Sequence, residues 1–132
     1  KLIKESVREL EKKRKLFFNA IVPNIKTPDI YNRYMVSVNL TPSGNYDKTV
    51  LESMACETLV LVSSKAFEDA VPKEFIFKEN DADDLAEKLQ LVFKLPEDEK
   101  ILSGQKLRRY IIENHNLNLL AEKLSSAAAV PI

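Results

Sequence analysis

The sequence predicts an α/β fold, in which a short parallel sheet of about four strands is covered by helices on both faces. Short apolar segments alternate along the chain with segments whose apolar residues recur at helical spacing. The chain has 132 residues, 45% of them hydrophobic and 30% charged, which is the size and balance of one domain with its own core. We therefore expect residues 1–132 to form a single domain, a three-layer sandwich.

Four apolar segments are the predicted strands of this sheet. Residues 16–22 form an apolar run closed by Pro23-Asn24, which is typical of a strand buried on both faces. Residues 36–40 precede a cluster of turn residues, and residues 59–62 are purely aliphatic. Residues 75–77 form a weaker fourth segment.

Helices are predicted between and after these strands. Pro28 and Pro96 stand near the first turn of two of them, where proline is tolerated, and Asp47 and Asp81 precede two others as candidate N-caps. The predicted helices cover residues 1–13, 30–35, 48–56, 81–93, 96–111 and 117–128.

Charge and cysteine content exclude several classes of protein. Twenty Lys and Arg balance twenty Asp and Glu, so no broad positive field is present to hold nucleic acid or an anionic membrane. No apolar run approaches the roughly 20 residues that cross a bilayer, and no signal-peptide pattern opens the chain. The single cysteine, Cys56, forms neither an internal disulfide nor a Cys-rich zinc site. We expect a reducing, cytoplasmic compartment, with no nucleic-acid partner and no bound metal.

One segment carries the features of a ligand site. Ligands of open parallel sheets bind at the carboxyl ends of the strands, where loops lead into helix N-termini. After residue 40 a predicted strand ends, a turn containing Gly44 follows, and a helix begins behind Asp47. The candidate binding residues here are Ser43, Gly44, Asp47, Lys48, Thr49, Val50 and Glu52.

Two interpretations of Lys48 and Glu52 stay open on chemistry alone. The two residues are four positions apart and share the helix face opposite the predicted core. They could supply a cation for a phosphate group and a carboxylate for sugar hydroxyls. They could equally form a solvated ion pair worth a few tenths of a kcal/mol.

Several motifs resemble the group 1 glycosyltransferases, the retaining enzymes of the GT-B fold. Pro42-Ser43, then Leu51-Glu52-Ser53-Met54-Ala55-Cys56, then the aliphatic residues 59–62 are similar to a stretch of that family in order and spacing. Weaker similarity runs from about residue 16 to residue 124. The resemblance implies a Rossmann-like fold and a partial carboxyl-terminal, donor-binding domain.

The resemblance also implies a function and site roles. Such enzymes bind a nucleotide-activated sugar and transfer the glycosyl group to an acceptor with retention, without a metal. Glu52 matches a glutamate that holds the ribose hydroxyls of the donor, and two adjacent O–H donors suit a carboxylate. The amides of Lys48, Thr49 and Val50 match those that meet the diphosphate. We expect Glu52 and these amides to line one crevice.

Three positions depart from the family pattern. Gly44 stands where the family has the first glutamate of its pair, so no catalytic residue is assigned. Asp47-Lys48 replaces Phe-Gly of many members, and Asp47 is either a substitute ligand or a helix N-cap worth about 1 kcal/mol. Glu57 stands where the family usually has glycine before the strand, so a left-handed helix end is less comfortable there.

The resemblance implies that this chain is part of a larger enzyme and inactive alone. An acceptor-binding domain and the first two βα units of the donor domain are expected outside it. Residues 17–22 and 36–40 then either pair directly or leave an open sheet edge that a second copy of the chain fills. The alternative is a non-catalytic module, either a Rossmann-like nucleotide-binding domain or a structural α/β domain.

Other chemically capable residues have ordinary explanations. His115 is interpreted as a surface or capping residue in a helix break, and Cys56 as a core residue. Ser63 and Ser64 follow the third predicted strand and are expected to face the predicted crevice, and Glu68 is near an acidic position of the family in the next helix. They fit supporting groups of a site and ordinary helix-start residues equally well.

Overall fold

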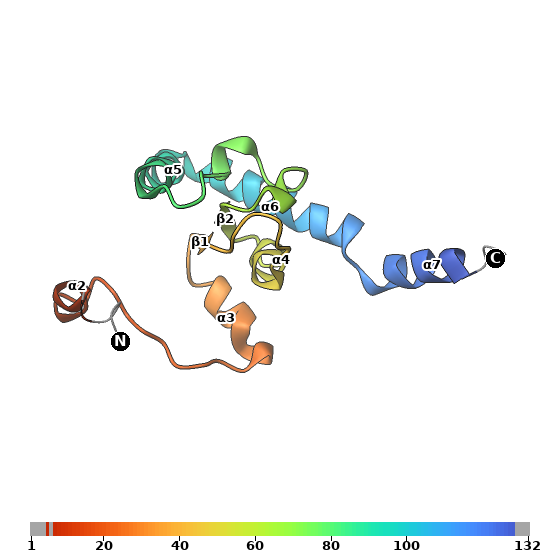
Figure 1. Cartoon of the computed structure of the whole chain (residues 1–132), viewed down its shortest axis with the longest axis horizontal. Helices are drawn as coiled ribbons and strands as arrows, with labels where there is room; N and C mark the ends of the chain where they lie inside the picture. Colours follow the sequence, from red (N-terminus) through yellow and green to blue (C-terminus); the bar gives the residue numbers. More distant parts are fainter. Residues whose placement is uncertain (1–4, 6, 129–132) are drawn as a thin grey trace.

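The computed structural model describes residue 5 and residues 7–128, and its fold is α/β with mostly helical content (Figure 1). Two parallel strands, β1 (Val36–Asn39) and β2 (Leu59–Val62), pair with Val36 opposite Leu59 and Asn39 opposite Val62. In the described part of the chain they make up the whole sheet.

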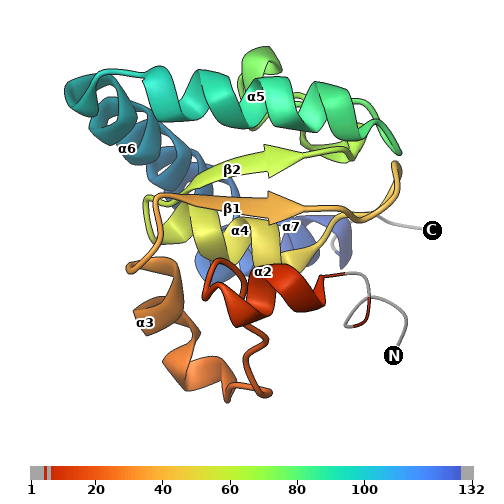
Figure 2. The same cartoon turned by 90° about the vertical axis from the view of Figure 1, so that its left-hand side faces the viewer.

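Helices surround these strands. Figure 2 shows α5 above the two strands and α4 below them, and both helices contact the sheet. Helix α6 packs against α4 and β2. The α-helices are α2 (Arg8–Lys12), α3 (Thr27–Tyr31), α4 (Lys48–Ala55), α5 (Ala82–Lys94), α6 (Glu97–Asn114) and α7 (Leu117–Ala128), and the 3₁₀-helices are η1 (Asn24–Lys26), η2 (Lys65–Phe67) and η3 (Lys73–Phe75).

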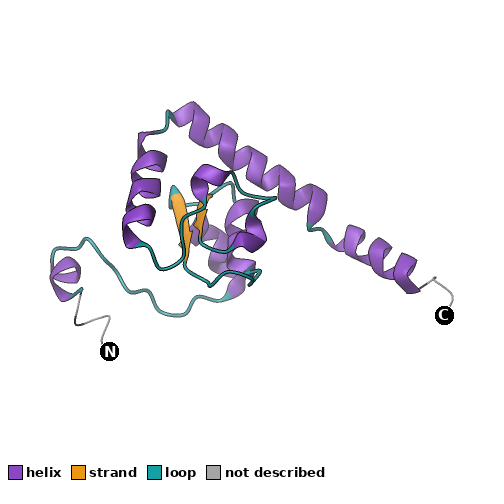
Figure 3. Cartoon of the chain, turned by 45° about the horizontal axis from the view of Figure 1, so that its top comes forward, coloured by secondary structure: helices purple, strands orange, loops and turns teal. Residues whose placement is uncertain are grey.

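The predicted strand at residues 16–22 is wrong. This segment forms an extended loop between α2 and η1 (Figure 3). The side chain of Ile21 in it is fully exposed. A strand needs neighbours for its backbone N–H and C=O groups. No described strand lies beside this segment, so its apolar composition is not enough to form one.

The predicted fourth strand at residues 75–77 is reduced to one bridge. Ile76 pairs with Val62, and the Phe77 N–H donates to the Val62 carbonyl oxygen at 3.0 Å. Phe75 belongs to the 3₁₀-helix η3, which begins after Pro72, so it is not part of a strand. The described sheet therefore has two strands where about four were predicted.

Helix predictions after residue 47 are confirmed within one to three residues. The short helix predicted at 30–35 is present but lies earlier, as α3, with Pro28 in its first turn. It ends at Tyr31, because the Met35 carbonyl oxygen already accepts the Leu59 N–H at 3.2 Å. Of the helix predicted over residues 1–13, the structure has α2, and residues 1–4 and 6 lie outside the described residues.

The core is centred on β2, whose four residues are all buried. Side chains from α4, α5, α6 and the loop around η2 and η3 complete it, namely Val50, Met54, Phe67, Val71, Phe75, Phe77, Val92 and Leu107. β1 lies at the edge of this core, with three of its residues half-buried and Val38 exposed. Of the two predicted alternatives, direct pairing of residues 17–22 with β1 is therefore excluded, and no described strand covers the outer edge of β1.

Candidate functional site

The loop between β1 and α4 is fastened to the end of β2. The Ser63 hydroxyl donates to the Thr41 carbonyl oxygen at 3.1 Å, and the Ser64 hydroxyl donates to the Asn45 carbonyl oxygen at 2.9 Å. Gly44 adopts φ +94°, a left-handed backbone that glycine accommodates without strain. Ser63 and Ser64 thus hold the shape of the predicted site loop from outside it.

Asp47 is the N-cap of α4, as one of its two interpretations predicted. Its Oδ1 accepts the Thr49 N–H and hydroxyl, both at 2.9 Å. Its Oδ2 accepts from the Asn39 amide at 2.9 Å and the Thr41 hydroxyl at 2.8 Å. These bonds, above all the one from the Thr49 N–H, lower the pKa of Asp47 to about 2. All four acceptor positions of the carboxylate are therefore occupied.

This cap changes which amides are open to a ligand. The Thr49 N–H is taken by the Asp47 carboxylate, and the Val50 N–H donates to the Asp47 carbonyl oxygen at 3.2 Å. Val50 itself is a core residue. Among the described residues the Lys48 N–H has no hydrogen-bond partner, and the Lys48 side chain is exposed.

Glu52 lies on the side of α4 that faces η1 and α3. Its Oε1 accepts from the Asn24 side-chain amide at 3.1 Å, and its Oε2 accepts from the Tyr31 hydroxyl at 3.3 Å. Burial raises the pKa of Tyr31, and the negative charge of Glu52 raises it further. The carboxylate is half-buried and carries one neutral donor on each oxygen.

A cavity of about 320 Å³ lies at the carboxyl ends of the strands, where Leu40 and Ser63 line it. Ser43 stands beside it, since its N–H donates at 3.0 Å to Glu79, another lining residue, and its hydroxyl oxygen accepts the Lys65 N–H at 3.3 Å. The expectation that Glu52 and the amides of residues 48–50 line one crevice is wrong for this cavity, because none of these residues lines it.

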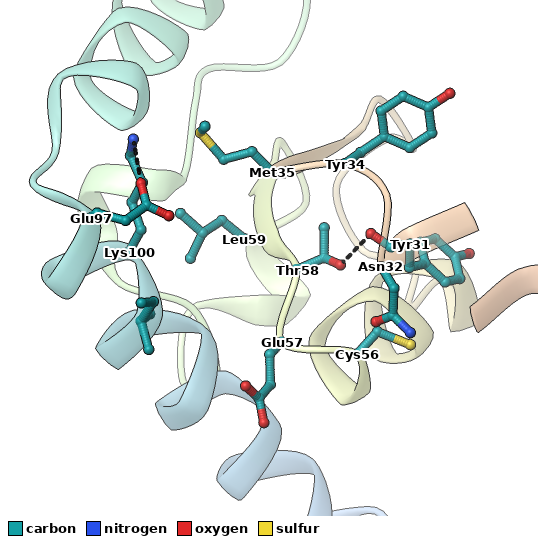
Figure 4. A pocket seen from close by; sticks show the side chains of 11 residues that line it. Tyr31, Asn32, Tyr34, Met35, Cys56, Glu57, Thr58, Leu59, Glu97 and Lys100 are labelled. Carbon is teal, nitrogen blue, oxygen red and sulfur yellow. Dashed lines mark hydrogen bonds and ion pairs between the residues drawn. The ribbon is translucent and has the colours of Figure 1, made fainter. Parts of the chain in front are cut away.

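A second cavity, of about 210 Å³, lies at the opposite, amino ends of the strands (Figure 4). Lys100 and Glu97 form an ion pair at 3.4 Å on one wall, and Thr58 bonds to the Tyr31 carbonyl oxygen on the other. Cys56 also lines it and is half-buried at the end of α4. Burial raises the pKa of its thiol, with an opposing contribution from the Arg108 guanidinium, so the thiol stays protonated at neutral pH.

Tyr46 connects the site loop to two distant elements. Its ring stacks on Phe67 with centroids 4.6 Å apart, and its hydroxyl lies 2.8 Å from His115 Nε2. Burial raises the pKa of Tyr46, and neighbouring Tyr110 adds to the effect. His115 is the C-cap of α6, which confirms its interpretation as a capping residue.

Several partners of the predicted residues were missed from the sequence. Asn39 and Thr41 had a local signal, because an Asn side chain often bonds the backbone two residues on, as Asn39 does with the Thr41 N–H at 3.0 Å. No local sequence signal existed for Asn24, Tyr31 or Glu79, because each of them bonds a residue that is 21 to 36 positions away in the chain.

Comparisons with known family models, curated proteins and solved structures find no match to this chain. Within residues 7–128, no cluster of three His, Cys, Asp or Glu side chains could hold a metal ion. Nor does that part of the chain contain a helix long and apolar enough to span a membrane.

Proposed function

We propose that this chain is part of the donor-binding domain of a retaining group 1 glycosyltransferase, with a Rossmann-like fold. It binds the nucleoside diphosphate of a sugar donor beside the N-terminal half of α4. An acceptor-binding domain and further strands of the sheet lie elsewhere in the parent enzyme, and the chain alone does not catalyse transfer. The observation that carries the proposal is the position of the Glu52 carboxylate between Asn24 and Tyr31.

The bonding of Glu52 leaves it able to bind a ribose. A carboxylate offers about four acceptor positions, and Asn24 and Tyr31 use one on each oxygen. The remaining position on each oxygen suits two neighbouring hydroxyl groups of a ribose. The two donors also fix the plane of the carboxylate, which reduces the conformational entropy lost on binding.

Lys48 is the residue through which the diphosphate is held. Its ammonium group is exposed one turn before Glu52, and its N–H, at the start of α4, has no hydrogen-bond partner among the described residues. The positive end of the helix favours an anion there. Thr49 and Val50 contribute less than the family resemblance implies, because Asp47 already occupies their N–H groups.

Calorimetric titration of the intact parent chain with uridine and guanosine diphosphates and their sugars tests the proposal. We expect binding that weakens at least tenfold in Glu52→Ala, because the ribose loses its acceptor. Glu122→Ala removes an exposed glutamate of α7 and serves as the matched control, with binding unchanged. Equal affinity in Glu52→Ala and the unaltered chain would contradict the proposed site.

A second candidate is a structural α/β module without a ligand. It is favoured by the Asp47 cap, which places a fully bonded negative charge at the start of α4. In that case no nucleoside diphosphate produces binding heat, and Lys48→Ala changes nothing in the titration. Nucleotide binding that Lys48→Ala weakens would exclude this alternative.

A further inference from the structure

The chain is neutral as a whole, but its charges are separated along the sequence. Residues 12–28 contain five Lys and Arg and no Asp or Glu, whereas the remaining positions hold fifteen Lys and Arg against twenty Asp and Glu. Four of the five cations are consecutive, at residues 12–15. Exposed charges act over about one Debye length, roughly 8–10 Å, so a local cluster can attract an anionic surface although the net charge is zero.

The cations at residues 12–15 lie on one tight turn at the end of α2. The Arg14 N–H donates to the Glu11 carbonyl oxygen at 3.0 Å, and the Lys15 N–H donates to that of Leu10 at 2.9 Å. This pair of bonds closes a helix through a left-handed residue, which is usually glycine. Here that residue is Arg14, with φ 53°. The sequence thus keeps a positive charge where glycine would relieve the backbone.

Most charges of this turn are not neutralised within the chain. Lys12 pairs with Glu9 at 3.0 Å. Lys13, Arg14 and Lys15 are exposed and form no ion pair among the described residues. The helix dipole favours a cation in the last turn of α2, but Arg14 and Lys15 follow the helix end. Three positive charges are therefore available to a partner.

Exposed apolar side chains follow these cations. Phe17 is 69% exposed, Ile21 is fully exposed, and Ile25 in η1 is 88% exposed. Between Lys15 and Lys26 the sequence contains no charged residue. Cations next to exposed aromatic and aliphatic side chains are typical of a segment that lies at a membrane surface.

The segment is held against the body of its own chain. Residues 19–22 line a cavity of about 330 Å³ together with Asp29 and Ile30 of α3. The Asn24 side chain donates to Glu52 on α4 at 3.1 Å. The basic turn and the exposed apolar side chains are thus presented together, at the end of the molecule where α2 stands apart from the strands (Figures 1 and 3).

We propose that residues 12–26 dock the protein on a membrane that contains anionic lipids. The cations of the turn lie at the lipid phosphates, and Phe17, Ile21 and Ile25 enter the boundary between headgroups and acyl chains. The acidic remainder of the chain is repelled by the same membrane, which orients the bound protein. The docking goes beyond the proposed function and does not depend on a bound nucleotide. It needs no strand at residues 16–22 and leaves the edge of β1 to the parent enzyme.

A nucleic acid fits this surface less well than a membrane does. It would satisfy the cations, but Ile21 and Ile25 have no aromatic face on which a base could stack. The long uncharged interval between Lys15 and Lys26 also offers nothing to a continuous phosphate backbone. A lipid boundary satisfies both the cations and the aliphatic side chains.

Co-sedimentation of the intact parent chain with lipid vesicles tests the docking. We expect binding to vesicles of phosphatidylserine and phosphatidylcholine in equal amounts, and binding at least roughly tenfold weaker to phosphatidylcholine alone. Added salt should weaken binding to the mixed vesicles, because it screens exposed charges. Equal binding to both kinds of vesicle, or binding to neither, would overturn the proposal.

A variant without the unpaired cations locates the contact. Lys13→Gln, Arg14→Gly and Lys15→Gln together should weaken binding to the mixed vesicles at least roughly tenfold. Glycine suits the left-handed position of Arg14, so urea unfolding is expected to show no loss of stability. Lys123→Gln removes an exposed cation of α7 and is the matched control, with binding unchanged. Unchanged binding in the triple variant would refute the docking surface.

Phe17→Ala tests the apolar part of the surface. It should weaken binding to the mixed vesicles roughly tenfold, because the ring no longer leaves water. Leu117→Ala on α7, where Leu117 is 82% exposed, should leave binding unchanged. Equal losses in the two variants would indicate general apolar adsorption and contradict the proposal. So would a parent chain that binds single-stranded DNA through residues 12–15 but does not bind the vesicles.

Discussion

At the scale of single residues, Asp47 has the clearest role. Its carboxylate accepts four hydrogen bonds, from Asn39, Thr41 and Thr49, and so joins the end of β1 to the first turn of α4. Because these donors stabilise the charged form, its pKa falls from 3.8 to about 2. Asp47, which the sequence also allowed as a substitute ligand of the family's site, is a helix N-cap in this fold.

Because of this cap, the free energy of unfolding depends on pH in the acidic range. Between about 4 and 2 the unfolded chain binds a proton that the folded chain excludes, so the contribution of Asp47 is full above pH 4 and is lost as pH falls towards 2. Asp47→Asn keeps a good capping residue but removes this titration. We expect urea unfolding to show a shallower acid decline in Asp47→Asn, with Asp69→Asn, an exposed site, as the control. Identical pH profiles for Asp47→Asn and the unaltered chain would contradict this role.

At the scale of elements, the end of α4 carries a strained residue. Its last turn closes with the Thr58 N–H on the Ser53 carbonyl oxygen and the Glu57 N–H on that of Met54, the pattern that favours glycine after the C-cap. Glu57 occupies that place with φ 61°. Gly104 of α6 packs against the Glu57 backbone carbonyl, where a Cβ would clash, so this turn also sets how closely α6 approaches.

Glu57→Gly is expected to stabilise the protein. It relieves a left-handed backbone that costs a non-glycine residue about 1 kcal/mol, while the exposed pair with Arg108 that it removes contributes little. The free energy of unfolding in urea should rise by about 1 kcal/mol. Glu57→Ala removes the same ion pair but keeps the strain, so it should bring no gain. A loss of stability in Glu57→Gly would show that the side chain matters more than the backbone.

At the scale of the whole molecule, stability is concentrated around β2. The buried side chains of α4, α5 and α6 converge on it, whereas α7 has no buried residue and extends from the body (Figure 1). A helix of 12 residues is marginal in water without packing. The free energy of unfolding therefore depends little on α7.

A variant truncated after Asn116, which lacks α7, tests whether stability is concentrated around β2. Its free energy of unfolding is expected to stay within about 0.5 kcal/mol of the full chain, because no core contact is removed. Leu107→Ala, a substitution at a buried residue of α6, should by contrast cost about 2–5 kcal/mol. Chemical denaturation of both variants measures the difference. Destabilisation of the shortened chain by several kcal/mol would mean that α7 packs on the body in solution.

The predictable part of the fold and the site consists of contacts close in sequence. The unit from β1 through the loop to α4 and β2 was predicted, and the Asp47 cap was one of two interpretations of that residue. Each depends on residues within a few positions of one another. The position of Glu52 on α4 was predicted as well, but not the contacts that define its surroundings.

The sequence by itself determined the α/β class, the order of the central elements and the helix caps, because hydrophobic periodicity and capping act within one turn or one strand. Only the tertiary structure decided that residues 16–22 form no strand, that residues 75–77 shrink to one bridge, and that Glu52 meets Asn24 and Tyr31. A strand and a half-buried carboxylate both need partners from distant parts of the chain. Composition shows that a segment can pair, whereas folding decides whether a partner is within reach.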